Sequence, residues 1–251
     1  TTTFNLTNQA DAPASITAMA GNNQNTTVNN PFATNLQALV KDQYGNVVPN
    51  AKITFTTPKS GASAITNNTI TTDINGQVSI PVKANTIAGG YTVSLGDSGA
   101  SAQFSLTNNP DKPSKITATA GNNQSTVVNT QFATNLQALV TDQYGNAIPN
   151  ASITFTTPTS GASGTIAGST FNTNKNGQVS IPVTANTIPD SYIIGVYING
   201  VAEGANFNLT NQLETILQEN LVRLGRDLQD ETENKTRKHR PSTMCVCSIS
   251  E

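Results

Sequence analysis

The sequence of 251 residues has little charge, few aromatic residues and no Trp. Asp, Glu, Lys and Arg make up 11% of it, against roughly 25% in an ordinary globular protein. The net charge is −2, so we expect no nucleic-acid binding based on phosphate neutralisation. No apolar run reaches the roughly 18 residues that a membrane-spanning helix needs, so the sequence predicts no membrane insertion by this chain.

His and Cys are missing from residues 1–212, and the only ones in the chain are His239, Cys245 and Cys247. Without a His, a Ser-His-Asp triad cannot form in this part. Its acidic residues are scattered singly, whereas glycoside hydrolysis needs a pair of carboxylates. No phosphate-binding G-x-x-x-x-G-K-[ST] loop occurs. We therefore predict a protein that is not an enzyme, with no catalytic and no cofactor-binding residues.

The charge density changes abruptly after residue 212. Residues 1–212 hold 15 charged residues, and the last 39 hold 13. An amphipathic helix is predicted over 212–230 because five leucines recur there at spacings of three or four, namely Leu213, Leu217, Leu221, Leu224 and Leu228. This stripe is expected either to dock on a domain or partner or to self-associate weakly. Residues 231–251 are predicted to be disordered, and the two Cys with one distant His form no complete metal site.

The charge-poor part is an internal duplication. Residues 13–63 return as residues 113–163 with 39 identities in 51 positions. Each unit closes on a similar motif, FSLTN at Phe104 and FNLTN at Phe207. Residues 1–13 match the end of a unit plus its linker, so we expect the natural protein to continue upstream with another copy. No signal peptide is recognised at the start, and an exported protein would be represented here by a mature piece or a fragment.

Each unit alternates apolar and polar residues at period two, which is typical of strands with one buried face. Turn sequences rich in Gly, Asn, Asp and Pro separate the alternating runs. About seven short strands per unit indicate a β-sandwich of ~100 residues. We predict an all-β protein with two tandem domains over residues 14–106 and 114–211. The linker 107–113 contains two prolines and is expected to bend less than a Gly/Ser tether.

Two sequence blocks point to a known family. The first, V-x-D-x-x-G-N-x-x-P-N-A-x-I-x-F, spans Val40–Phe55 and Val140–Phe155, and the second, T-x-x-N-G-Q-V, spans Thr72–Val78 and Thr173–Val179. With these blocks, residues 14–211 resemble the bacterial immunoglobulin-like (Ig-like) repeats of the invasin and intimin type, the Big-1 domains. The G-G-Y-T-V motif of the first copy reads DSYIIGV in the second, where the chain departs from the pattern.

The resemblance implies tandem Ig-like β-sandwiches in a stalk on the bacterial cell surface. In that family such repeats carry a binding tip away from the outer membrane, in which the full-length parent is anchored. The implied localisation is extracellular. The implied partner is a protein or glycan on the surface of a host or neighbouring cell.

The polar residues of the Asp-x-x-Gly-Asn turns allow two interpretations. Asp42 and Asn46 in the first copy, and Asp142 and Asn146 in the second, are weak candidates for a calcium site, because carboxylate and amide oxygens bind Ca²⁺. The alternative is a hairpin turn in which the Asp carboxylate accepts backbone N–H bonds. Tyr44, inside the first turn, is expected either to pack on a neighbouring domain or strand or to contact a ligand.

Three functions fit these observations. The first is a non-enzymatic, adhesin- or invasin-like stalk whose domains project a binding module or contribute to adhesion. The second is a module that itself binds a glycan or a protein through an edge strand or loop tips. The third is a pair of accessory domains of a larger secreted enzyme.

Overall fold

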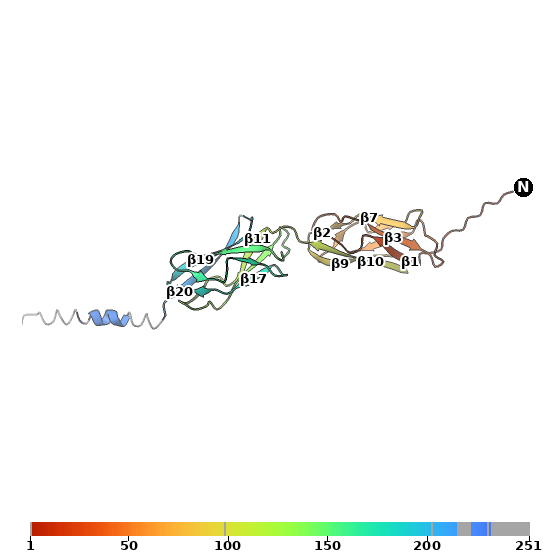
Figure 1. Cartoon of the computed structure of the whole chain (residues 1–251). Helices are drawn as coiled ribbons and strands as arrows, with labels where there is room; N and C mark the ends of the chain where they lie inside the picture. Colours follow the sequence, from red (N-terminus) through yellow and green to blue (C-terminus); the bar gives the residue numbers. More distant parts are fainter. Residues whose placement is uncertain (1, 98, 202, 215–221, 230, 232–251) are drawn as a thin grey trace, which may run out of the picture.

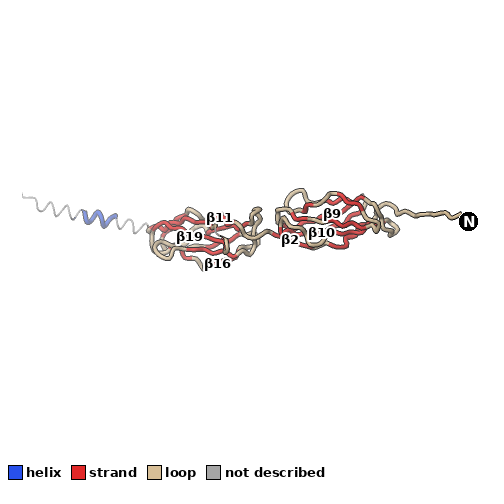
Figure 2. The backbone as a smooth tube through the Cα atoms, turned by 90° about the horizontal axis from the view of Figure 1, so that it is seen from above, coloured by secondary structure: helices blue, strands red, loops and turns tan. Residues whose placement is uncertain are grey.

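The computed structural model describes residues 2–97, 99–201, 203–214, 222–229 and 231. The described residues form two β-sandwiches that lie end to end, with the N-terminal segment at one end of the molecule (Figure 1). A view turned by 90° gives the same linear arrangement (Figure 2). The predicted all-β architecture of two tandem sandwiches is confirmed.

Domain 1 comprises strands β1 to β10. Its smaller sheet has the order β1-β3-β7, its larger sheet has the order β2-β10-β9-β4-β6, and β5 pairs with β8. The bounds are β1 Ser15–Ala20, β2 Gln24–Thr27, β3 Leu36–Lys41, β4 Lys52–Thr56, β5 Ala64–Ile65, β6 Thr69–Thr71, β7 Gln77–Ile80, β8 Lys83–Ala84, β9 Gly89–Asp97 and β10 Ala100–Asn109.

Domain 2 repeats this topology with strands β11 to β20. Its sheets have the orders β11-β13-β17 and β12-β20-β19-β14-β16, and β15 pairs with β18. The bounds are β11 Lys115–Ala120, β12 Gln124–Val127, β13 Leu136–Thr141, β14 Ser152–Thr156, β15 Gly164–Thr165, β16 Thr170–Asn172, β17 Gln178–Ile181, β18 Thr184–Ala185, β19 Asp190–Ile198 and β20 Gly204–Gln212.

The described part of each domain thus contains ten strands where the sequence predicts about seven. The additional ones are short, and β2 and β12 contain mainly polar residues, so they lack an apolar alternation. Both are held at the sheet edge by parallel pairing with the last strand of their domain. The departure of the second copy at Asp190 does not disturb its last hairpin, because β19 and β20 pair from Asp190↔Asn211 to Tyr197↔Gly204.

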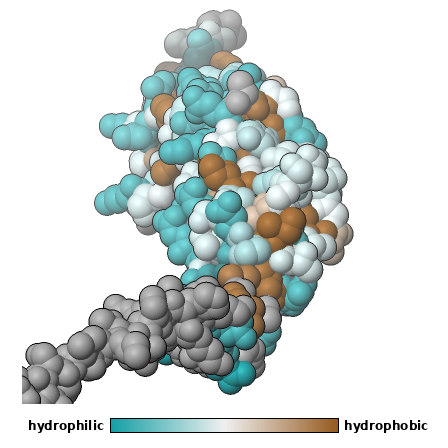
Figure 3. Space-filling view, turned by 90° about the vertical axis from the view of Figure 1, so that its left-hand side faces the viewer, coloured by the Kyte–Doolittle hydropathy of each residue, from teal (hydrophilic) through white to brown (hydrophobic). Residues whose placement is uncertain are grey.

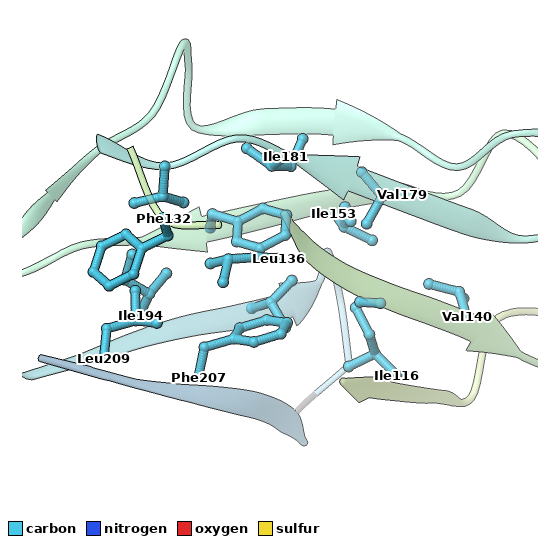
Figure 4. Packing of buried hydrophobic residues seen from close by; sticks show 14 of the residues in the cluster. Ile116, Phe132, Leu136, Val140, Ile153, Val179, Ile181, Ile194, Phe207 and Leu209 are labelled. Carbon is cyan, nitrogen blue, oxygen red and sulfur yellow. The ribbon is translucent and has the colours of Figure 1, made fainter. Parts of the chain in front are cut away.

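Each domain has its own hydrophobic core between its two sheets. The core of domain 2 is made by residues of that domain alone, and the same holds for domain 1. In Figure 4, Leu136, Ile194 and Phe207 point toward one another from different strands, and Phe132, from the segment before β13, lies beside them. Phe207 is fully buried, and its ring stacks on that of Phe155 at a centroid distance of 6.2 Å. The period-two alternation therefore identifies the buried face of each long strand, and each sandwich buries a core without help from the other.

The linker is shorter than the predicted 107–113. Residues 107–109 belong to β10 and pair with β2, and β11 begins at Lys115. Asn108 is only 1% exposed, which a linker residue would not be. The connection between the domains is therefore residues 110–114, with the sequence PDKPS.

The predicted helix 212–230 is wrong at its start, because Gln212 ends β20 and Leu213 and Glu214 are not helical. Residues 222–229 are helical, and Leu224 and Leu228 are each 60% exposed. The apolar stripe is therefore open to solvent at these two positions. Leu217, Leu221 and the predicted disordered residues from 232 onward, with His239 and both Cys, lie outside the described residues. Within the described part, no helix is both long and apolar enough to cross a lipid bilayer.

Candidate functional site

The Asp-Gln-Tyr-Gly-Asn turn of each domain is organised by its Asp carboxylate. In domain 2, Asp142 Oδ1 accepts hydrogen bonds from the backbone N–H of Tyr144 and of Asn146, each at 2.9 Å. Its Oδ2 accepts from Asn146 Nδ2 and from the backbone N–H of Asp111, each at 2.9 Å. Asp42 in domain 1 has the same four bonds at 2.8–3.1 Å. Each carboxylate oxygen thus accepts two N–H bonds, which is the geometry of an Asx turn.

These bonds also set the acidity of the two carboxyl groups. Burial by itself raises the pKa of Asp142, but the hydrogen bonds from Asn146 and from the backbone N–H of Asp111 and Tyr144 outweigh it, so the pKa lies below the ordinary 3.8. The pKa of Asp42 is lowered by the equivalent bonds against the same opposing effect. Because the folded-state pKa is the lower one, the stabilisation is present above about pH 4 and is lost as the pH falls through the folded-state value.

The turn geometry leads us to expect no calcium dependence. Ca²⁺ needs about six to eight oxygen ligands, whereas the oxygens of Asp42 and Asp142 already accept N–H donors. In the described part of the chain, no three His, Cys, Asp or Glu residues lie close enough to hold a metal ion together. Titration with millimolar Ca²⁺ should therefore leave the melting temperature of both domains unchanged, and Mg²⁺ serves as the control. A rise with Ca²⁺ alone would restore Asp42, Asn46, Asp142 and Asn146 as ligands.

A glycine of the T-x-x-N-G-Q-V block lies directly against this turn. Gly76 has φ +70°, its C=O accepts from the backbone N–H of Val40 at 2.9 Å, and its N–H donates to the carbonyl of Asp73 at 3.0 Å. A Cβ at this position would lie 2.9 Å from the carbonyl oxygen of Val40 and from Val47 Cβ. Only glycine accommodates both the positive φ and this approach. The two sequence blocks of the resemblance are therefore the two halves of one packed structure that positions the turn.

The linker is attached to the turn of the domain that follows it. Gln143 Nε2 donates to Asp111 Oδ2 at 2.8 Å, and the backbone N–H of Asp111 donates to Asp142. The equivalent bonds occur at the start of domain 1, where Gln43 Nε2 donates to Asp11 Oδ2 and the backbone N–H of Asp11 donates to Asp42 Oδ2. Each linker Asp is therefore a structural residue that fixes the entry of the chain into its domain, beside the prolines that restrict the backbone there.

The turn of domain 2 also contacts domain 1. Asn146 Oδ1 accepts from the backbone N–H of Ala88 at 2.8 Å, and Asn146 Nδ2 donates to the Thr86 carbonyl at 2.9 Å. A third bond runs from Asn29 Nδ2 to the Tyr144 hydroxyl at 3.2 Å. We call these three bonds the junction. For Tyr44 the sequence predicts either packing on a neighbouring domain or strand or contact with a ligand; Tyr44 is 75% exposed, and it is the equivalent Tyr144 that contacts the neighbouring domain.

The loop of domain 1 that receives Asn146 is held by a buried asparagine. Asn108 Nδ2 donates to Ser63 O at 3.0 Å, to Asn85 Oδ1 at 3.0 Å and to Ile87 O at 3.1 Å. Asn85 Oδ1 in turn accepts from the backbone N–H of Ile87 at 3.2 Å. The last strand of the domain thus fixes the loop 85–88 in position before the next domain contacts it. Neither Asn108 nor Ala88 is among the residues that the sequence singles out.

Two tyrosines outside the junction are half-buried or buried. Burial raises the pKa of Tyr91 and of Tyr192 to about 12, so both phenols stay neutral at physiological pH. On the end of domain 2 that Figure 3 shows, apolar residues form separate brown spots between larger hydrophilic areas. This face of domain 2 thus presents a mixed polar and apolar surface.

Comparison with known proteins agrees with this structure. The family model of the bacterial Ig-like domain (group 1) matches residues 19–103 and 127–210. The chain belongs to this family. Each Ig-like domain carries one match, and the two matches together cover more than half of the chain.

Relatives of these Ig-like domains include adhesins. The chain is 31% identical over 196 residues to the inverse autotransporter adhesin YeeJ of Escherichia coli (strain K12). The matched region covers 75% of this chain and 8% of YeeJ. The structure of FdeC, an Escherichia coli adhesin, is similar with a TM-score of 0.52 at 18% identity, over 81% of this chain and 66% of FdeC. That of InvD from Yersinia pseudotuberculosis has the same TM-score and identity over 76% of this chain and 55% of InvD. The likeness to these two structures shows the fold.

Proposed function

We propose that the two Ig-like domains are a non-enzymatic segment of an adhesin- or invasin-like stalk on the bacterial cell surface. The observation that carries this proposal is the junction, in which side chains of domain 2 hydrogen-bond to the loops of domain 1. With a connection of only residues 110–114, these bonds favour a fixed, extended arrangement of the two domains (Figure 2). An extended arrangement is what a stalk needs to hold a binding module away from a surface.

The relatives support the cellular context of this proposal. YeeJ is named an inverse autotransporter adhesin, and this chain spans 8% of its length. We infer that the parent of this chain is likewise extracellular and anchored in the outer membrane. We infer also that the parent binds a protein or glycan on another cell, and that the two domains described here hold the binding part at a distance.

Small-angle X-ray scattering of the full chain, compared with the variant Asn146→Ala, tests the stalk. We expect the wild-type scattering to fit the extended arrangement of the two domains. Asn146→Ala should broaden the distance distribution, because it removes two of the three junction bonds. The matched control is Asn46→Ala, which changes the equivalent turn of domain 1, away from the junction. A compact or already broad distribution for the wild-type chain would contradict the proposal.

A glycan array and a cell-binding assay on the same chain separate the stalk from a binding module. A stalk segment gives no specific binding in either assay. Specific binding that is lost on changing the residues of one loop would favour the alternative, in which the domains themselves recognise a glycan or protein.

A further inference from the structure

The turn of domain 1 is a second copy of the docking half of the junction, with no domain placed on it. Asp42 and Asn46 have the same internal bonds as Asp142 and Asn146. The linker side is also present, because Asp11 bonds to Gln43 and Asp42 as Asp111 does to Gln143 and Asp142. Tyr44 is 75% exposed, whereas Tyr144, which contacts domain 1, is 39% exposed.

This end of domain 1 also exposes apolar side chains. Val47 is 38% and Ile74 is 82% exposed. Both line one open cavity of about 700 Å³ together with Asn46 and residues 7–10. The corresponding position to Ile74 in domain 2 is Lys175. The surface around Asn46 therefore combines the hydrogen-bonding groups of a junction with uncovered apolar area.

The segment that leads into this surface has the sequence of a last strand. Residues 4–9 read FNLTNQ, identical to residues 207–212 at the end of domain 2. The side chains of Phe4 and Leu6 are 82% and 91% exposed, whereas Phe207 and Leu209 are 0% and 1% exposed in β20. A strand of this sequence buries these two side chains only when it lies in the sheet of an Ig-like domain. The occupant that the segment brings to the Asn46 surface is thus another domain of the same kind.

The loop that such a domain must present is defined by domain 1. Asn146 requires a carbonyl at Thr86 and a backbone N–H at Ala88. In domain 2 the equivalent of Asn29 is Asn129 and the equivalent of Thr86 is Thr187. The equivalent of Ala88, however, is Pro189.

A proline at this position cannot make the junction. Its nitrogen carries no hydrogen, and its ring occupies the space into which the N–H of Ala88 points. An approaching Asn amide oxygen would therefore meet Cδ and lose its donor. The loop itself tolerates the proline, because Asn186 Oδ1 accepts from Ile188 N–H at 3.1 Å, as Asn85 Oδ1 does from Ile87 N–H.

We propose that the turn Asp42–Asn46 is a docking site for the 85–88-type loop of another Ig-like domain, and that the residue at the Ala88 position decides whether docking occurs. The loop of domain 1 has a backbone N–H at Ala88 for docking. The loop of domain 2 has Pro189 there instead, so the far end of domain 2 does not hold a following domain in the same orientation. This inference extends the proposed stalk function and rests on it.

The test is a chain in which a third copy, residues 14–103, is placed directly before Phe4 of the full chain. We expect residues 4–9 to complete the added domain as its last strand. Amide ¹⁵N relaxation should then show the added domain tumbling together with domain 1, as domain 1 does with domain 2. Proline at the Ala88 position of the added copy should make the added domain tumble independently. Asn46→Ala in the original domain 1 should have the same effect. Pro189→Ala is the matched control and should change neither junction.

The outcomes separate this proposal from the stalk function. If the added domain folds but tumbles independently while domains 1 and 2 tumble together, the docking site is wrong and the stalk stands. If domains 1 and 2 themselves tumble independently, both the docking site and the stalk function are wrong.

Should the added domain fail to fold, Ala88→Pro in the original chain tests the proline rule at the existing junction. We expect it to loosen the two domains as much as Asn146→Ala does, with no further loosening in the double variant; an Ala88→Pro chain whose domains stay coupled would overturn the rule.

Discussion

A chain carrying Phe207→Ala is expected to lose about 3–5 kcal/mol of the unfolding free energy of domain 2 while domain 1 unfolds as before. Phe207 is 0% exposed in β20 and stacks on Phe155, so its removal leaves a cavity in the core. The loss stays in one domain because the two cores share no residue.

Differential scanning calorimetry of the full chain checks this expectation. Phe207→Ala should lower one transition and leave the other in place. Phe104→Ala, at the equivalent buried position of domain 1, should do the reverse. A single transition that shifts as a whole in both variants would show that the two halves fold as one unit, against the structure.

The second large effect is expected from Asn108→Ala, which should destabilise domain 1 by about 1–3 kcal/mol and also loosen the junction. The Asn108 side chain is 1% exposed and donates to three acceptors that hold the loop 85–88. Without it, acceptors such as the buried Ser63 O lose their donor. The loop then no longer presents Thr86 and Ala88 to Asn146 in one fixed geometry.

Asn211→Ala is the matched control for this prediction. Asn211 makes the same three kinds of bonds in domain 2, to Ser163, Asn186 and Ile188, but that loop takes no part in the junction. Hydrogen exchange of amides in each domain measures the two stabilities, and the scattering profile measures the junction. Equal loosening of the junction by both variants would mean that the loop geometry does not control it.

The buried face of each domain was predictable from the sequence because most long strands alternate apolar and polar residues. Leu36, Ala38 and Val40 are all 0% exposed in β3, as their spacing of two predicts. The alternation fails for β2, whose residues Gln24–Thr27 are mainly polar. That strand is held by backbone pairing with β10 and by its own loop, so its side chains carry no signal of it.

The boundary of the linker was missed for a related reason. Residues 107–109 read as a polar connection because Thr and Asn are common in turns, yet Asn108 is buried and hydrogen-bonded inside the domain. The repetition of LTN at the end of each unit marks this position in the sequence.

The sequence predicts the position of the candidate site and the turn-forming role of its Asp residues, but not the contact that Asn146 makes with the other domain. The Asp-x-x-Gly-Asn turns were singled out, and the structure places Asp42 and Asp142 in the Asx turns of one of the two interpretations. The contact of Asn146 with Ala88 depends on how one domain lies on the next, which single-sequence patterns do not encode. The exchange of Ala88 for Pro189 is visible in the duplication, but its meaning needs the geometry of the junction.

Residual dipolar couplings of backbone amides in the full chain test the central claim, that two separate sandwiches are held in one orientation by the junction. Fitted separately, domains 1 and 2 should each agree with their own sandwich and give the same alignment tensor in the orientation of Figure 1. Two tensors that differ clearly in magnitude and direction would show domains that reorient freely, and the stalk account would be contradicted.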